Sequence, residues 1–321
     1  MLKLFKNNTI GQILVIILAA IALWVRAFIA PITPVYEEHF SPIYEIIFGL
    51  LSPLPRLASA IALLIVLIEG AWINLMLFNH KMSKVGSLLP TLMYLVAMSW
   101  SSENLTITPT LFSNIFIIAA CNQLLSEGSS SLDIEKNFNA SFLVAMAGMC
   151  HMPSLTYIVP LFGVFVIYKL YNWRAFIVSI LGLIAPSIIL FSYAFLSDKF
   201  DYYFILLQYD ITNLNVVTSY DNGLEIATNI IFILMLMAAL LNLLSSLNDK
   251  TIQQRINSGV VILPLVAASV MLFYYQIFTI NTQFAAIPFA FLANLFLSQD
   301  RKRPWISETL FWILIVSSII T

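Results

Sequence analysis

Long apolar runs alternate with short polar segments along almost the whole chain of 321 residues. A helix needs about 20 apolar residues to cross the hydrocarbon core of a bilayer, and a transmembrane barrel would show alternating positions instead of solid runs. The pattern therefore predicts an all-α fold, a polytopic transmembrane helix bundle of about eleven spans that forms one transmembrane domain over residues 1–321. The predicted spans are 10–30, 57–78, 86–101, 109–125, 138–150, 154–171, 175–197, 224–247, 258–278, 281–298 and 305–321.

Two polar segments are longer than the other connections. Residues 31–56 hold prolines at 31, 34 and 42, which forbid one continuous helix and predict a bent, acidic outer loop followed by a short interfacial helix over residues 42–51. Residues 197–223 carry four tyrosines and predict a longer, partly interfacial outer loop that covers a cavity from outside. The span over 138–150 is short, so the stretch 150–153 is predicted to form a tight outer turn or a break within the membrane.

Composition supports a membrane protein and excludes one class of partner. Of all residues, 60% are hydrophobic and only 10% are charged, with a mean hydropathy of +0.93, whereas soluble domains carry about 25% charged residues. A formal net charge of -1 without a basic stripe argues against nucleic acid. Cys121 and Cys150 are predicted near opposite membrane faces, which argues against a disulfide or a thiolate metal site.

The basic residues predict the orientation of the chain. With the amino terminus in the cytoplasm, twelve basic residues fall inside, only Arg56 and Lys199 fall outside, and Arg26 lies within the first span. An excess of lysine and arginine is typical of cytoplasmic loops. The lysines before the first span also fit a secretory leader, but the apolar run over 10–30 is long enough to span. The outer face then collects Glu37, Glu38, Glu45, Glu103, Asp198, Asp201, Asp210 and Asp221.

The loop over 31–56 contains the first candidate site. Glu37, Glu38 and His39 are consecutive there, so two carboxylates and an imidazole can act as a general base or hold a divalent cation that bridges a phosphate. Adjacent carboxylates are also common in solvated loops, and this spacing is not a specific metal motif. A plain polar connection is therefore the alternative interpretation, and the sequence identifies neither a metal nor another cofactor.

Two charged residues lie within predicted spans. Arg26, near the outer end of the first span, can extend to the phosphate layer or bind an anionic lipid substrate. Glu69 lies near the middle of the second span, where a charge costs at least about 2.5 kcal/mol, so it must face the bundle interior and be protonated, paired or functional. Asn74, Asn114 and Asn122 are alternative partners for it within the bundle.

Two more polar residues on the predicted outer face are substrate-binding candidates. Glu103 lies in the turn before Pro109, and His151 lies at the predicted break before Pro153. A single histidine at a helix break is more often a hydrogen-bonded interface residue than a ligand, but it shares its face with the acidic pair. No Walker loop, dinucleotide fingerprint, HExxH or GxSxG motif is present, so chemistry driven by a soluble nucleotide is not indicated.

Three stretches carry a sequence resemblance. The opening LFKNNT, the run TPTLFSNIFIIAACNQLL at 108–125 and the run NWRAFIVSILGLIAPSIILFSYAFLSDKF at 172–200 resemble an uncharacterised family of bacterial inner-membrane proteins of about this length. The resemblance covers most of the chain. It implies a bacterial inner-membrane location and brings no established activity.

The layout of the chain resembles that of GT-C-type glycosyltransferases. The shared features are a first span, an outer loop with an acidic pair and an interfacial helix, an acidic turn before a span that starts at Pro109, a break near Pro153 and an arginine after the next span. In that superfamily, acidic residues of the first outer loop serve as base or cation ligand in transfer from a polyprenyl-phosphate-linked sugar. The resemblance therefore implies catalytic roles for Glu37 and Glu38. This chain has two glutamates where pairs containing aspartate are usual, and residues 1–321 predict no large soluble domain after the last span.

Two functions from different classes follow. The first is a GT-C-like glycosyltransferase that uses a polyprenyl-phosphate-linked sugar at the outer face, with membrane lipid and the lipid-linked sugar as partners. The alternative is a non-catalytic membrane subunit or a transporter, in which Glu69 couples or packs and the outer acids are only solvated. Inverted repeats with discontinuous helices would favour the transporter. A cavity lined by Glu37, Glu38 and His151 with lateral access for a lipid tail would favour the transferase.

Cysteine-accessibility labelling tests the predicted orientation. Because the basic residues mark the cytoplasmic loops, we expect cysteines to react from the cytoplasmic side when they are placed at Lys81, Lys136, Lys250 and Lys302. Cysteines should react from outside when they are placed at Glu38, Glu103 and Asp210. Labelling of position 210 from the cytoplasmic side alone would overturn the scheme.

Overall fold

Helices make up the described part of the chain. The computed structural model describes residues 5, 9–34, 40–83, 87–125, 134–168, 173–212, 223–247, 251–275, 282–297, 308, 309, 312, 315 and 318. No residue in these ranges belongs to a strand, so the predicted all-α class is confirmed. The elements are α2 (Thr9–Ile29), α3 (Pro42–Leu51), α4 (Pro55–Asn79), α5 (Leu89–Met98), the 3₁₀ helix η1 (Ser102–Leu105), α6 (Pro109–Leu124), α7 (Ile134–Cys150), the 3₁₀ helix η2 (Met152–Tyr157), α8 (Ile158–Ile167), α9 (Trp173–Leu196), α10 (Phe200–Thr212), α11 (Gly223–Ser246), α12 (Ile252–Tyr275) and α13 (Thr282–Leu297).

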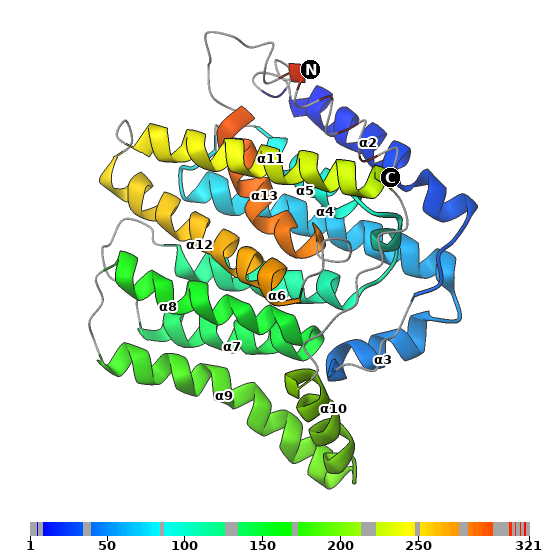
Figure 1. Ribbon diagram of the computed structural model, residues 1–321, viewed down its shortest axis with the longest axis vertical. Coiled ribbons are helices and arrows are strands. Elements are labelled where there is room, and N and C mark those ends of the chain that lie inside the picture. Colours follow the sequence, from blue (N-terminus) through cyan, green and yellow to red (C-terminus); the bar gives the residue numbers. More distant parts are fainter. Residues whose placement is uncertain are drawn as a thin grey trace.

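Helices α5 and α13 form the centre of the bundle (Figure 1). All ten residues of α5 are buried, and so are the side chains of α13 over residues 283–297. Helix α5 contacts α2, α4 and α13, and α13 also contacts α6, α11 and α12. Helices α2 and α9 lie at opposite edges of the ribbon in this view (Figure 1). The core therefore sits around α5 and α13, and the longest apolar helices surround it.

The peripheral helices present apolar side chains to their surroundings. Ile17 and Leu18 on α2, and Phe195 and Leu196 on α9, are each more than half exposed. Three stretches in the described ranges, Ile10–Ile29, Pro55–Asn79 and Trp173–Leu196, are long and apolar enough to cross a membrane. The other apolar helical stretches found in the described residues, such as Leu89–Met98 and Ile230–Ser246, are shorter, so the count of about eleven spans stays a prediction.

The predicted span over 86–101 is helical over only ten residues, Leu89–Met98. At 1.5 Å per residue, α5 is about 15 Å long, half the thickness of a bilayer core. The chain then continues through η1 to Thr108, and Trp100, Leu105 and Ile107 in this segment are buried. Trp24 Nε1 of α2 donates a hydrogen bond to Ser99 Oγ at 2.8 Å, at the end of α5. Protein atoms therefore bury much of this segment between α5 and α6, which is the condition under which a membrane protein tolerates an interrupted helix.

Two helices end at a residue with positive φ that is not glycine. Lys81 after α4 has a φ of 57°, and Asp198 after α9 has a φ of 54°. In each case the next backbone N–H reaches back to the last turn, from Met82 to Leu77 O at 2.8 Å and from Lys199 to Ala194 O at 2.9 Å. This is the Schellman arrangement, in which glycine is the usual residue. The turn at Asp198 starts α10, so the segment 197–223 begins with a helix where a loop was predicted.

The charged residues distinguish the two ends of the bundle, and hydrogen bonds join distant segments at one of them. Leu88 N donates to Gln12 Oε1 at 2.7 Å, and Gln254 Nε2 donates to Lys81 O at 3.3 Å. We call this end the basic end, since Lys81, Lys136, Arg174 and Arg255 lie there. The opposite end, the acidic end, carries Glu45, Glu103, Asp198, Asp201 and Asp210. Asp210 is buried, so the exposed Asp201 on the same helix is the better position for external labelling.

Gly182 allows α9 to lie close against α7. A Cβ built at Gly182 would come within 2.7 Å of Phe138 O and 2.8 Å of Ser141 Cβ. Small residues at such contacts let helix backbones approach in membrane bundles. Because the nearest atom belongs to the backbone and cannot rotate away, the contact requires glycine at this position.

We expect Gly182→Ala to destabilise the protein by about 1–3 kcal/mol, the usual cost of overpacking. Unfolding of the purified protein in detergent measures the effect. Gly49→Ala is the matched control, because a Cβ at Gly49 meets nothing within 4 Å. Unchanged stability of the Gly182 variant would show that the two helices separate at little cost.

Candidate functional site

The carboxyl group of Glu69 lies inside the bundle on α4. Its side chain is 1% exposed, and Tyr94 Oη on α5 donates a hydrogen bond to Glu69 Oε2 at 2.8 Å. The other oxygen, Oε1, has no hydrogen-bond partner among the described residues. Thr91 Oγ1, one turn before Tyr94, donates to Gly70 O at 3.0 Å, and a Cβ at Gly70 would press on Thr91 at 3.2 Å. The close approach of the two helices at Gly70 therefore brings Tyr94 to Glu69.

Asn114 on α6 and Gln283 on α13 extend this hydrogen-bond network. Asn114 Nδ2 donates to Tyr94 Oη at 3.3 Å and to Gln283 backbone O at 3.1 Å. Gln283 Oε1 accepts from Thr108 Oγ1 at 2.6 Å. The same threonine oxygen caps α6 by accepting from Leu111 N at 3.2 Å. We call these residues the Glu69 network; its members are Glu69, Tyr94, Asn114, Gln283 and Thr108.

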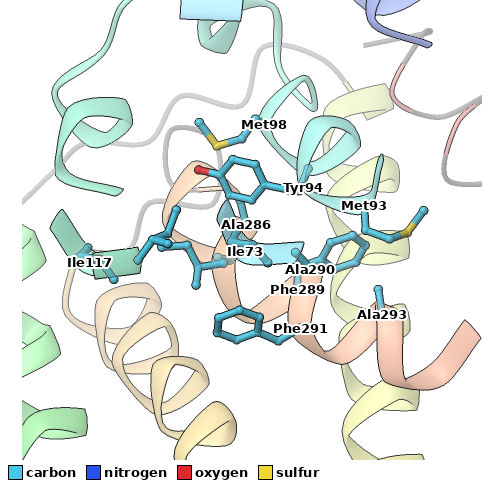
Figure 2. Close-up of a cluster of buried hydrophobic side chains, with 14 of the residues drawn as sticks. Ile73, Met93, Tyr94, Met98, Ile117, Ala286, Phe289, Ala290, Phe291 and Ala293 are labelled. Carbon is cyan, nitrogen blue, oxygen red and sulfur yellow. The ribbon is translucent and has the colours of Figure 1, made fainter. Parts of the chain in front are cut away.

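Apolar side chains lie around Tyr94 (Figure 2). Ile73 comes from α4, Ile117 from α6, and Ala286 and Phe289 from α13, and all four are buried. In such an environment a hydrogen bond is strengthened and an unpaired polar group is costly. The Glu69 network is therefore a polar centre within an apolar core.

A second chain of hydrogen bonds starts at His151, at the end of α7. His151 Nδ1 lies 3.2 Å from Ser154 Oγ. Ser154 Oγ donates to Ser113 Oγ at 3.0 Å, and Ser113 Oγ donates to Thr110 O at 2.9 Å. Because the Ser154 hydroxyl has only one hydrogen, it accepts from His151, so Nδ1 carries the proton and Nε2 is the acceptor nitrogen of the neutral ring. His151 is half-buried at the acidic end.

The two predicted outer loops contact each other at the acidic end. Phe40 N donates to Asp210 Oδ2 on α10 at 2.7 Å. Tyr203 Oη on the same helix donates to Glu45 Oε2 on α3 at 3.3 Å. Burial, and after it the nearby Glu45 carboxylate, raises the pKa of Tyr203 to about 12. The phenol therefore stays protonated and can donate this hydrogen bond at physiological pH.

Phe40 anchors the first of these loops in a small apolar cluster. Its ring stacks on Phe191 with centroids 6.5 Å apart and meets Tyr203 edge to face at 6.4 Å. Met152, which follows His151, packs against the same cluster. Tyr44 Oη donates to Ile107 O at 3.1 Å and joins α3 to the segment before α6. The segment that follows the acidic pair in the sequence is thus held at the break between α7 and α8.

The structure places the candidate residues in two regions. The catalytic candidates Glu37 and Glu38 lie outside the described residues. Arg26 is exposed in the last turn of α2, and Glu103 is exposed in η1, which contacts α2. With His151, these substrate-binding candidates lie at the acidic end, whereas Glu69 lies in the core.

Among the asparagines considered as partners of Glu69, Asn114 joins its network, and it does so through Tyr94. Asn74 Oδ1 has no partner in the described part of the chain. Asn122 lies near the end of α6, half-buried and two turns beyond Asn114. Of the three asparagines, Asn114 is therefore the one that joins the Glu69 network, because it reaches the hydroxyl of Tyr94.

The sequence did not identify Tyr94 or Gln283, and it placed Asp210 on the outer face without predicting its contact with Phe40. Tyr94 lies in an apolar run, where an aromatic residue is typical of plain core packing. Its role depends on the contact of α4 with α5, which no local pattern encodes. Gln283 could have been identified from the sequence as a residue of a buried polar network. A glutamine at the start of an apolar helix requires a hydrogen-bond partner when it is buried.

The donor sets limit the chemistry that each region can perform. Within the described residues, no group of three or more His, Cys, Asp or Glu side chains could hold a metal ion. The acidic end offers the half-buried His151 and the carboxylates of Glu45 and Asp210, which already accept hydrogen bonds. The Glu69 network offers one carboxyl oxygen and one amide oxygen that accept no hydrogen bond from described residues, at Glu69 and Asn114. Proton transfer or cation binding suits these groups.

We expect Asp210→Ala to loosen the contact of the first outer loop with α10. Loss of a hydrogen bond to a charged group costs about 1.5–3 kcal/mol. Unfolding in detergent and proteolysis at residues 31–41 measure the change. Asp201→Ala, exposed on the same helix, is the control and should stay within about 0.5 kcal/mol. Equal behaviour of the two variants would show that the Asp210 contact does not hold the loop.

No protein-family model matches the sequence, and neither a curated protein nor a solved structure matches it. The geometry of the site itself is therefore the basis for the function proposed below.

Proposed function

We propose that this chain is a multipass protein of the bacterial inner membrane with its amino terminus in the cytoplasm. The support is the apolar surface of the peripheral helices, where side chains such as Leu181, Ile188 and Leu234 are more than half exposed. Exposed apolar surface of this extent is unfavourable in water and suits a lipid environment. Separation of the basic and acidic ends supports the orientation, because the described lysines and arginines at the basic end match a cytoplasmic face.

At its acidic end, the protein acts on a lipid-linked anionic substrate as a GT-C-like glycosyltransferase that uses a polyprenyl-phosphate-linked sugar. The observation that carries this proposal is the hydrogen bond between Phe40 N and Asp210 Oδ2. It joins the loop that contains the acidic pair to the second outer loop, next to the half-buried His151. A transferase needs its acidic groups and its substrate-binding groups at one end of the bundle. The contact between Phe40 and Asp210 supports this arrangement, because it holds the two outer loops together near His151.

Each candidate residue takes a role that fits its chemistry. Glu37 and Glu38 serve as general base or as ligands of a cation that bridges the substrate phosphate. Arg26, exposed in the last turn of α2, binds the anionic group of the lipid. Glu103 and His151 provide hydrogen-bonding groups for the sugar or the acceptor. The partners are then membrane lipid and the lipid-linked sugar.

A second candidate function is a transporter or a non-catalytic membrane subunit. The Glu69 network favours it, because an ionisable residue buried among transmembrane helices often belongs to an ion or substrate pathway. The short α5 and the segment with the 3₁₀ helix η1 that follows it are also typical of discontinuous helices in transporters. In this function the acidic pair of the first outer loop would be a solvated connection.

Amide variants of the acidic pair separate the two functions. Glu37→Gln with Glu38→Gln keeps the shape of both side chains and removes their charge, so transfer should fall by about 10²-fold or more if either residue is the base. The measurement is release of polyprenyl phosphate from polyprenyl-phosphate-linked sugars in membranes that contain the protein. Glu135→Gln, exposed in the first turn of α7 at the basic end, is the control and should leave the release unchanged.

Two results would count against the transferase. One is release by the double variant at the level of the unchanged protein. The other is full rescue by the double variant of the growth or envelope phenotype of a deletion strain. Either result would leave the transporter or subunit as the better account of the chain.

A further inference from the structure

Two buried oxygen atoms of the Glu69 network have no hydrogen-bond partner in the described part of the chain. They are Glu69 Oε1 and Asn114 Oδ1. Both side chains are buried, with 1% and 0% exposure, and both contact the same Tyr94 hydroxyl, at 2.8 and 3.3 Å. Buried polar atoms nearly always have a partner. These two oxygens therefore point to a ligand that donates a hydrogen bond or carries positive charge.

The surrounding hydrogen bonds determine which atoms remain acceptors. Gln283 backbone O can only accept, so the nitrogen of the Asn114 amide must face it and Oδ1 must point elsewhere. The single hydrogen of the Tyr94 hydroxyl goes to Glu69 Oε2. A proton on the Glu69 carboxyl group therefore resides on Oε1. Glu69 Oε1 and Asn114 Oδ1 are the groups left to receive a ligand, and both offer lone pairs.

Few titratable groups lie on the elements that contact α4. They are Arg26 on α2, Tyr44 and Glu45 on α3, Tyr94 on α5, Glu103 on η1 and Cys121 on α6, and α13 has none in residues 283–297. On α4 itself, Arg56 is about 20 Å from Glu69 along the helix at 1.5 Å per residue. Both arginines are exposed at the acidic end. No cationic side chain of the described residues therefore balances a charge on Glu69.

We infer that Glu69 and Asn114 form an internal site for one monovalent cation, either a proton on Glu69 Oε1 or Na⁺ bound by Glu69 Oε1 and Asn114 Oδ1. One positive charge neutralises the single carboxylate, whereas a divalent ion would leave an uncompensated charge in the apolar core. Oxygen ligands of these types suit hard cations and are used for Na⁺ and protons at discontinuous membrane helices. The site does not depend on the proposed transferase, because it lies in the core and uses none of the acidic-end residues.

Infrared spectroscopy of the purified protein tests the proton. A protonated carboxyl group absorbs above the amide band, and the unchanged protein at neutral pH should show such a band that is absent from Glu69→Gln. In Tyr94→Phe the carbonyl oxygen loses its donor, so the band should move to higher frequency. Asn74→Leu is the matched control, because Asn74 lies on the same helix and also has an oxygen without a described partner. This variant should leave the band in place.

Thermal unfolding at constant ionic strength, with Na⁺ exchanged for choline, tests the metal ion. Binding to the folded state raises the unfolding midpoint, so Na⁺ should stabilise the unchanged protein and Asn74→Leu. The stabilisation should be lost in Glu69→Gln and weakened in Asn114→Leu. If Glu69→Gln does not fold, the shifted band in Tyr94→Phe becomes the infrared test. The weakened stabilisation by Na⁺ in Asn114→Leu then becomes the test for the metal ion.

The two measurements distinguish the two ligands. A protonated-carboxyl band without an effect of Na⁺ identifies the proton, and an effect of Na⁺ without the band identifies Na⁺. An ionised Glu69 in a protein that is indifferent to Na⁺ overturns the inference. Stabilisation by Na⁺ that persists in Glu69→Gln also overturns it, because the ion then binds elsewhere.

Discussion

Burial of one carboxyl group in an apolar bundle is the constraint on which the centre of this structure depends. A charged residue at the centre of a bilayer costs about 2.5–3.5 kcal/mol on insertion scales, and an unsatisfied buried polar group costs about 1–3 kcal/mol. Helix α5 offsets part of this cost by bringing Tyr94 to Glu69. It can do so because Gly70 lets Thr91 approach α4. Enclosed on all sides, α5 does not need to match the thickness of a bilayer.

Much of the fold could be predicted because its signals are local. The spans predicted over 10–30, 57–78 and 175–197 match α2, α4 and α9 to within about two residues, since each is one apolar run with clear limits. The short helix α3 begins at Pro42 as predicted, because proline is favoured in the first turn of a helix. Helix α10 was not predicted. The turn before it has Asp198 in the left-handed conformation, and without a glycine this turn leaves no recognisable signal.

The candidate site could be predicted less completely, because its contacts join residues far apart in the chain. The cost of a charge in the middle of a span was enough to select Glu69. Its partner Tyr94 was not found, because tyrosine in an apolar run has no pattern that distinguishes a hydrogen-bonding role from packing. The bond between Phe40 and Asp210 joins positions 170 residues apart. Only the relative placement of α3, α9 and α10 brings them together.

Helix α6 joins the two polar regions of the protein. Ser113 belongs to the chain that starts at His151, and Asn114 belongs to the Glu69 network. Consecutive residues of an α-helix are rotated by about 100°, so the two networks occupy different faces of one helix. A rotation of α6 would break hydrogen bonds on both faces, and each buried group left without a partner would cost about 1–3 kcal/mol. The position of α6 is therefore set by the same requirement that pairs Tyr94 with Glu69.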